Sequence, residues 1–241
     1  HMKDKVIQFT KHPLISLSFV IVIGSLFSSF FSFLFNLFMS RNLSVADYGT
    51  LTSLVSLITL AIMPASALMP TVVHFSATYF ANNEQSKAYG LFFKVGKLSL
   101  AIGLILLLVF ITCASQIAGF FRIPDSSLFV IPGLIVLFSY LNIMNSGLLQ
   151  AKLAFGYITL AQLVGSLLKL IFGTVFVLLG FGVSGGMWAF FLAYFAPYLL
   201  TFIPLRFLFQ KQNTKTNVSL KELLSYGMPS ALTLFSLTSF I

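Results

Sequence analysis

One lysine, Lys169, lies near the middle of an apolar stretch, 158–179, that is long enough to cross a lipid bilayer. At helical spacing, Lys169 shares one face with Gln162, Gly165, Ser166 and Gly173. An ammonium group at the centre of a bilayer costs roughly 2.5–3.5 kcal/mol on insertion scales, so we expect this side chain to face protein, water or a ligand. The stripe therefore predicts a cavity between helices that accepts an anion. The alternatives are a lysine that snorkels to the interface or pairs with a polar neighbour in the bundle.

Other apolar stretches carry polar side chains at helical spacing, and these are the candidates for the remaining walls of the cavity. Small hydroxyl residues also allow helices to pack closely, so packing is the alternative reading of the same stripes. A single histidine near a helix end is more often a hydrogen-bonded interfacial residue than a functional one. The candidates outside 158–179 are Ser29, Ser32, Asn36, Thr52, Ser56, His74 and Asn142.

Residue types needed for most enzyme chemistry are not grouped in this sequence. The five acidic residues lie in the N-terminal lead, in loops or at span ends, whereas an enzyme acting within the membrane would normally need a carboxylate there. The histidines have no zinc-ligand spacing, and one cysteine cannot form an intramolecular disulfide. We therefore expect no catalytic site, no metal site and no cofactor.

Composition places the chain in a membrane. Hydrophobic residues make up 58% and charged residues 8% of the sequence, and its mean hydropathy is +1.00. Soluble domains carry about 25% charged residues, so a soluble globular fold is excluded. The formal charge of +9 does not indicate nucleic-acid binding, because the basic residues lie in short segments between apolar runs.

The pattern predicts an all-α membrane protein with a six-helix transmembrane bundle and the start of a seventh helix. Residues 1–12 form a basic cytoplasmic lead, in which 1–2 are typical of a cloning remnant, and 13–209 form the bundle. A cytoplasmic linker, 210–222, then precedes 223–241, the truncated start of a second bundle in a longer polypeptide. The expected spans are 13–39, 48–80, 98–118, 128–150, 158–179 and 187–208, with two prolines kinking the second span and a surface loop at 81–97.

Lysine and arginine are distributed unequally between the two sides of this topology. The lead, the loops after spans two and four, and the end of the sixth span with its linker hold 11 of them, against Arg41 and Arg122 on the other side. The positive-inside rule then predicts a multi-pass protein with its N-terminus and the linker in the cytoplasm. The family resemblance described below implies that the membrane is the inner membrane of a bacterium.

Three segments, in the same order, resemble bacterial polysaccharide flippases of the multidrug/oligosaccharidyl-lipid/polysaccharide (MOP) superfamily. SRNLSVADYGTLTSL is similar to the segment that follows the family's first helix, with Arg41, Leu43, Asp47, Tyr48 and Gly49 at the matching positions. The run from Lys169 through GTVFVLLGFGVSGG resembles the fifth helix and its glycine turn, and VSLKELLSYGMPSAL resembles the start of the second half.

This resemblance implies two six-helix bundles that work by alternating access, of which this chain would supply the first. It implies a substrate made of an oligosaccharide on polyprenyl pyrophosphate, and a cationic cavity residue, here Lys169, that holds the pyrophosphate. The expected partners are this glycan-lipid, membrane lipids and the missing C-terminal bundle, without nucleic acid. A multidrug exporter of the same superfamily and a non-transporting membrane scaffold are the alternative functions.

Overall fold

The computed structural model describes residues 13–66, 68–121, 123 and 125–206. The predicted linker and the start of the seventh helix lie outside this part of the chain. Within it, six helices are long and apolar enough to cross a membrane, so the predicted all-α six-helix bundle is confirmed. The elements are α2 (Pro13–Asn42), α3 (Val45–Ser66), α4 (Met69–Ala81), α5 (Gln85–Thr112), α6 (Ala114–Phe121), the 3₁₀ helix η1 (Ser126–Phe129), α7 (Val130–Ala151), α8 (Phe155–Leu178) and α9 (Gly182–Phe202).

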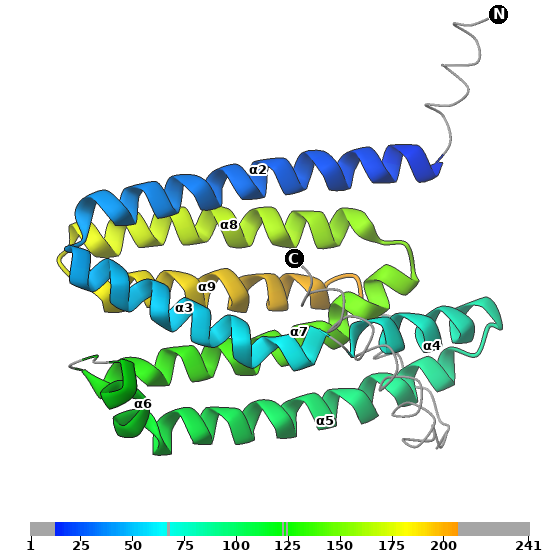
Figure 1. Cartoon of the computed structure of the whole chain (residues 1–241). Helices are drawn as coiled ribbons and strands as arrows, with labels where there is room; N and C mark the ends of the chain where they lie inside the picture. Colours follow the sequence, from blue (N-terminus) through cyan, green and yellow to red (C-terminus); the bar gives the residue numbers. More distant parts are fainter. Residues whose placement is uncertain (1–12, 67, 122, 124, 207–241) are drawn as a thin grey trace, which may run out of the picture.

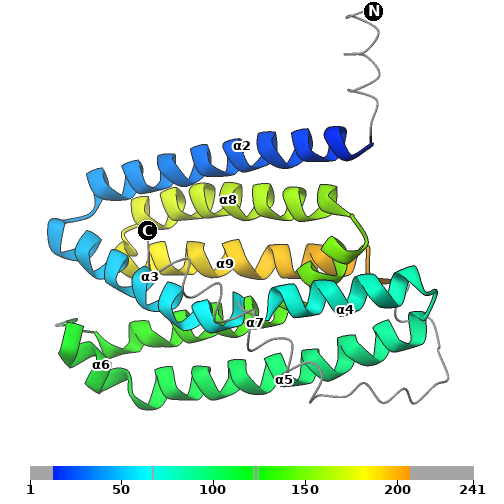
Figure 2. The same cartoon turned by 45° about the vertical axis from the view of Figure 1, so that its right-hand side comes forward.

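The long helices run antiparallel to their sequence neighbours, and α8 lies between α2 and α9 (Figures 1 and 2). Helix α7 is the most enclosed: 13 of its 22 residues are buried, and it packs against α5, α9, α4 and α3. Helix α2, by contrast, turns a run of phenylalanines outward, as expected for a helix that contacts lipid on one side. The bundle therefore has a buried central helix, and α8 with its polar stripe is held between two others.

Two hydrophobic clusters hold the helices together. The larger one joins α2, α3, α7 and α9 through fully buried side chains such as Phe35, Leu54, Ile135 and Met187. The smaller one joins α4, α5 and one end of α7 through residues including Leu91. Both clusters surround α7, because that helix carries apolar residues on nearly every face.

The second predicted span, 48–80, is wrong as a single helix. It divides into two helices, because α3 ends at Ser66 and α4 begins at Met69. Pro64 lies inside α3, and Pro70 occupies the first turn of α4, where a missing backbone N–H costs nothing. The Tyr140 hydroxyl of α7 donates to the Ala61 carbonyl at 3.2 Å, so a neighbouring helix stabilises the end of α3.

The predicted surface loop at 81–97 is also wrong, because α5 already begins at Gln85. Lys87 donates to Glu84 at 2.7 Å in the first turn, while Leu91 and Val95 are buried against the neighbouring helices. Polar residues on one face do not prevent a helix when the other face packs. The third span therefore begins 13 residues earlier than the hydropathy suggested, and α6 is a separate short helix.

The glycine turn after α8 ends that helix sharply. Gly180 has φ of +87°, and Phe181 N–H donates to the Phe176 carbonyl at 3.0 Å, which forms a Schellman motif. Gly182 also has a positive φ, of +52°. The chain therefore reverses within two residues of Gly180, and α9 begins at Gly182 and returns along α8. This turn brings the polar face of α8 against α9.

Candidate functional site

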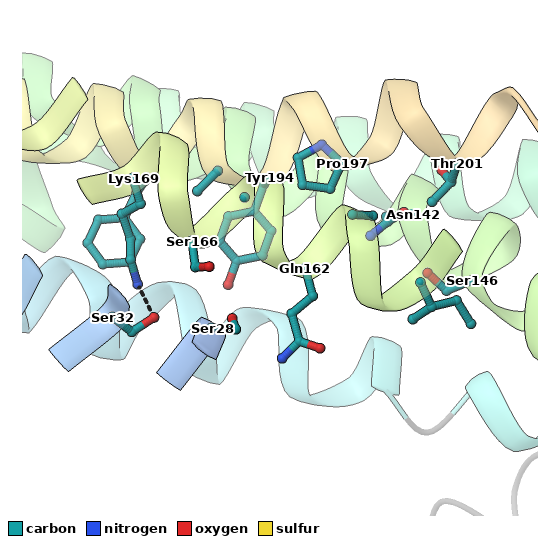
Figure 3. A pocket seen from close by; sticks show the side chains of 15 residues that line it. Ser28, Ser32, Asn142, Ser146, Gln162, Ser166, Lys169, Tyr194, Pro197 and Thr201 are labelled. Atoms are coloured by element: carbon teal, nitrogen blue, oxygen red, sulfur yellow. Dashed lines mark hydrogen bonds between the residues drawn. The ribbon is translucent and has the colours of Figure 1, made fainter. Parts of the chain in front are cut away.

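A cavity of about 300 Å³ lies between α2, α7, α8 and α9, in the middle of the bundle (Figure 3). Its wall combines an ammonium group, amides, hydroxyls and one phenol with a smaller number of apolar side chains. No carboxylate is among the residues that line it in the described part of the chain. The polar residues of the wall are Ser28, Ser32, Asn142, Ser146, Gln162, Ser166, Lys169, Tyr194 and Thr201.

Lys169 supplies the charge of this cavity. Its Nζ donates a hydrogen bond to Ser32 Oγ of α2 at 3.0 Å. The same Nζ lies 5.3 Å from the ring centre of Phe35 and 5.0 Å from that of Phe190, both within cation–π range. Among the described residues, these neutral contacts reduce the cost of burying the ammonium without balancing its charge. That the cavity accepts an anion stays a prediction.

Two glycines of α8 bring the neighbouring helices close enough to form the walls. A Cβ added at Gly165 would lie 2.6 Å from the Ala193 carbonyl oxygen of α9. A Cβ added at Gly173 would lie 2.5 Å from the Phe35 ring of α2. Because the Phe35 ring flanks the Lys169 ammonium, Gly173 also determines where the charge lies. The glycines of the predicted stripe thus act through close packing.

The structure brings five of the ten predicted site residues together in this cavity: Lys169, Gln162, Ser166, Ser32 and Asn142. They come from α2, α7 and α8, so residues more than 130 positions apart in sequence, Ser32 and Lys169, meet through one hydrogen bond. The lining of the cavity supports the predicted convergence of these polar faces. The role of each residue in binding stays a prediction.

The other five predicted site residues lie outside the lining of this cavity. On α2, Ser29 and Asn36 are exposed, whereas Ser28 is buried and faces the cavity with Ser32. The predicted polar stripe on α2 covers more of the helix surface than the part that faces the cavity. Helix α8 packs on Phe35 and Met39, and this packing turns Asn36 outward. His74 is exposed next to Phe75 and belongs to α4, a separate helix from α3, which ends at Ser66.

Thr52 and Ser56 belong to a different surface on α3. Their hydroxyls donate to carbonyls of their own helix, Thr52 to Tyr48 at 3.0 Å and Ser56 to Thr52 at 2.9 Å. Ser56 lines a second cavity of about 560 Å³ that is mainly apolar and includes Met63. Tyr194 lines both cavities.

Two further polar residues of the cavity wall, Ser28 and Ser146, lie on the same polar stripes as Ser32 and Asn142, so helical spacing also points to them. Sequence reasoning missed Tyr194 and Thr201 of α9. Thr201 accepts a hydrogen bond from buried Asn145 at 2.9 Å, which fixes α7 to α9 beside the cavity. The contribution of α9 depends on the glycine turn and could not be read from its sequence.

Comparisons with known proteins agree with this architecture. The sequence profile of a family described as polysaccharide biosynthesis protein matches residues 38–241. No curated protein matches the chain significantly. Among solved structures, a MOP superfamily transporter from Pyrococcus furiosus is similar at 18% identity, with a TM-score of 0.73, and the match covers 93% of this chain and 52% of that one.

Structures of multidrug transporters of the MATE family are also similar. One, in complex with MaD3S, matches with a TM-score of 0.74 at 21% identity, over 93% of this chain and 53% of that one. An outward-facing MATE transporter matches with a TM-score of 0.71 at 20% identity. The chain thus spans about half the length of these structures. It belongs to the polysaccharide biosynthesis protein family, and it has the fold of the N-terminal half of a MOP superfamily transporter.

Proposed function

We propose that this chain is the first bundle of a transporter that moves a polyprenyl-pyrophosphate-linked oligosaccharide across the cytoplasmic membrane of a bacterium. The observation that carries this proposal is the Lys169 ammonium, which only neutral groups of the described residues contact, inside a cavity with many polar side chains along the spanning helix α8. The family's description as a polysaccharide biosynthesis protein supports a glycan substrate. The MOP fold supports alternating access against a second bundle.

Lys169 would bind the pyrophosphate as the counter-charge. Two unit charges 4 Å apart attract by about 4 kcal/mol at an effective dielectric constant of 20, which exceeds what a neutral amide would supply. The Ser32 hydroxyl already accepts from the ammonium, so it holds the amine in place for the ligand. The phosphate can take further bonds from the ammonium, which has three donors.

The amides and hydroxyls of α7 and of the part of α8 before Lys169 would contact the sugar. Gln162 lies seven residues before Lys169, which is about 10 Å along the helix axis. Asn142 and Ser146 of α7 line the same end of the cavity. Amides and hydroxyls are the groups that hydrogen-bond to sugar hydroxyls in water-filled sites, so this end suits the first sugar unit.

Topology supports loading from the cytoplasm. The α4–α5 turn, the α7–α8 turn and the end of α9 lie at the same end of the bundle, and they carry Lys87, Lys152 and Arg206. Arg41 ends α2 at the opposite end. The positive-inside rule then assigns the lysine-bearing end to the cytoplasm, where the glycan-lipid would enter.

The test is transport by the full-length protein in cells that depend on it for surface glycan. Lys169→Met keeps the length of the side chain and removes its charge, and we expect the rate to fall at least about tenfold, which corresponds to 1.4 kcal/mol. Lys169→Arg should retain part of the activity. The matched control is Lys152→Met, because Lys152 also lies over an aromatic ring, that of Phe80 at 5.0 Å, but does not line the cavity.

Two results would contradict the proposal. Normal glycan export by Lys169→Met, at normal expression, would remove the role of the charge. Extrusion of cationic drugs without any effect on surface glycan would favour a multidrug exporter, and loss of neither activity in a deletion strain would favour a non-transporting scaffold.

A further inference from the structure

A second cationic site lies between the C-terminal ends of α2 and α8, on the side of these two helices that faces away from the Lys169 cavity. A groove of about 310 Å³ separates the two helices there. Its wall has an apolar part and, at one end, a cluster of an arginine, an amide and a hydroxyl. The groove is lined by Leu34, Leu37, Phe38, Arg41, Asn42, Leu170 and Thr174.

This groove is distinct from the Lys169 cavity. Arg41 follows Ser32 by nine residues, which places it about 13 Å further along α2 and about 180° around the helix. Thr174 follows Lys169 by five residues, about 140° around α8. Both side chains therefore lie on faces turned away from the cavity, and an ion bound at Lys169 cannot be the ligand of Arg41.

The depth of the groove matches the boundary between headgroups and hydrocarbon. Helix α2 runs from Pro13 to Asn42, and its 30 residues extend about 45 Å, more than the ~30 Å of a hydrocarbon core. Arg41, in the last turn, thus reaches the headgroup level. Leu34, about two turns earlier, lines the groove about 10 Å deeper, where acyl chains lie.

The polar end of the groove offers donors to an anion. Arg41 is exposed, and its guanidinium can form bidentate hydrogen bonds with phosphate oxygens. The neighbouring Asn42 side chain donates to the Phe38 carbonyl at 2.8 Å, so it closes the end of α2 and leaves Arg41 as the charged group at the mouth. An apolar slot with one cation at headgroup depth is complementary to a lipid that carries a negative charge.

We propose that this groove binds one anionic phospholipid, with an acyl chain between α2 and α8 and the phosphate on Arg41. The lipid would fill the groove between α2 and α8, on the side of these helices opposite to the Lys169 cavity. It would hold α2 against α8 at the end where the groove separates them. This proposal does not depend on the identity of the transported substrate.

The test is lipid retention by the full-length protein after purification in detergent, titrated with phosphatidylglycerol and measured by native mass spectrometry. Arg41→Gln should weaken binding about fivefold to tenfold, because one interfacial arginine and its phosphate bonds are lost. Thr174→Phe fills the groove without a change in charge and should weaken binding to a similar extent. The matched control is Arg206→Gln, an exposed arginine beyond α9 that does not line the groove.

Other probes separate the possible sources of binding. Glycerol phosphate, which has the headgroup chemistry but no acyl chain, should not protect the site at the concentration at which phosphatidylglycerol saturates it. Equal retention by Arg41→Gln and the unchanged protein would overturn the proposal. So would an equal loss in Arg206→Gln, since that result would indicate general surface electrostatics, or unchanged retention by folded Thr174→Phe.

Discussion

Two hydroxyl-bearing regions of this protein look alike in sequence and differ in the structure. On α3, Thr52, Ser56 and Thr59 follow one another at helical spacing and each donates to a carbonyl of its own helix. On α2, Ser32 instead accepts from Lys169 of α8. The first region satisfies its donors locally, whereas the second joins two helices around a charge. A stripe of hydroxyls therefore indicates a site only when another helix brings a group that needs it.

The difference between these regions begins with packing. Helix α8 lies close to α9 at Gly165 and to α2 at Gly173, whereas a Cβ added at Gly49 of α3 would meet no atom within 4 Å. Close approach allows the polar groups of α2, α7, α8 and α9 to share one cavity. Helix α3 contributes core residues such as Leu51 and Leu54 on its opposite face and leaves its hydroxyls outward.

The largest expected effect comes from breaking that close approach. Gly165→Leu would drive a side chain into the Ala193 carbonyl and Pro197, and we expect it to lower the free energy of unfolding by about 3 kcal/mol or more. Gly49→Leu is the matched control on α3 and should be nearly neutral. The measurement is the fraction of folded protein and its thermal stability in detergent. Equal losses in both variants would show that the contact between α8 and α9 at Gly165 is not more tightly packed than the surroundings of Gly49 on α3.

A buried pair beside the cavity should give the next largest effect on stability. Asn145 donates to Thr201 at 2.9 Å between α7 and α9, and both side chains are buried. Thr201→Val leaves the amide without its acceptor, which costs about 1–3 kcal/mol. Asn145→Leu together with Thr201→Val should cost less than the sum of the single variants, because neither orphaned group remains. Additive losses would show that the two residues act independently.

The comparison can be tested most directly with two single serines. Ser32→Ala removes the acceptor of the Lys169 ammonium, so we expect transport to fall about tenfold, as for a hydrogen bond to a charged group. Ser56→Ala removes only a bond within α3 and should change transport less than about twofold. Initial transport rates at matched expression decide this. If Ser56→Ala has the larger effect, the α3 surface is the functional one.

The smallest effect concerns the start of α3. Ser44 Oγ donates to Asp47 Oδ2 at 2.7 Å and accepts from the Asp47 N–H at 3.1 Å, as in a capping box. Ser44→Ala should lower stability by about 1 kcal/mol without a change in transport. Ser44→Asp should restore most of the loss, since aspartate is a good N-cap. A transport defect in stable Ser44→Asp would show that this turn has a functional role.

The capping box also explains one of the segments that resemble the flippase family. Arg41, Asp47 and Gly49 lie where α2 ends and α3 begins, so the pattern records a helix boundary and its cap. Such local patterns are visible in sequence because the residues concerned interact within a few positions. The glycine turn after α8 is readable for the same reason.

The amino-acid sequence by itself determined the membrane class, the six spanning helices, the family and the unusual position of Lys169, because apolar length and one buried charge are local properties. Only the tertiary structure decided which polar faces meet. The orientation of α2 about its axis places Ser28 and Ser32, and not Ser29 and Asn36, in the cavity wall. Helix α3 ends at Ser66, so His74 belongs to another helix, and α5 begins within an apparently polar stretch. These outcomes depend on which helix packs against which, and that choice is made by contacts between residues far apart in the chain.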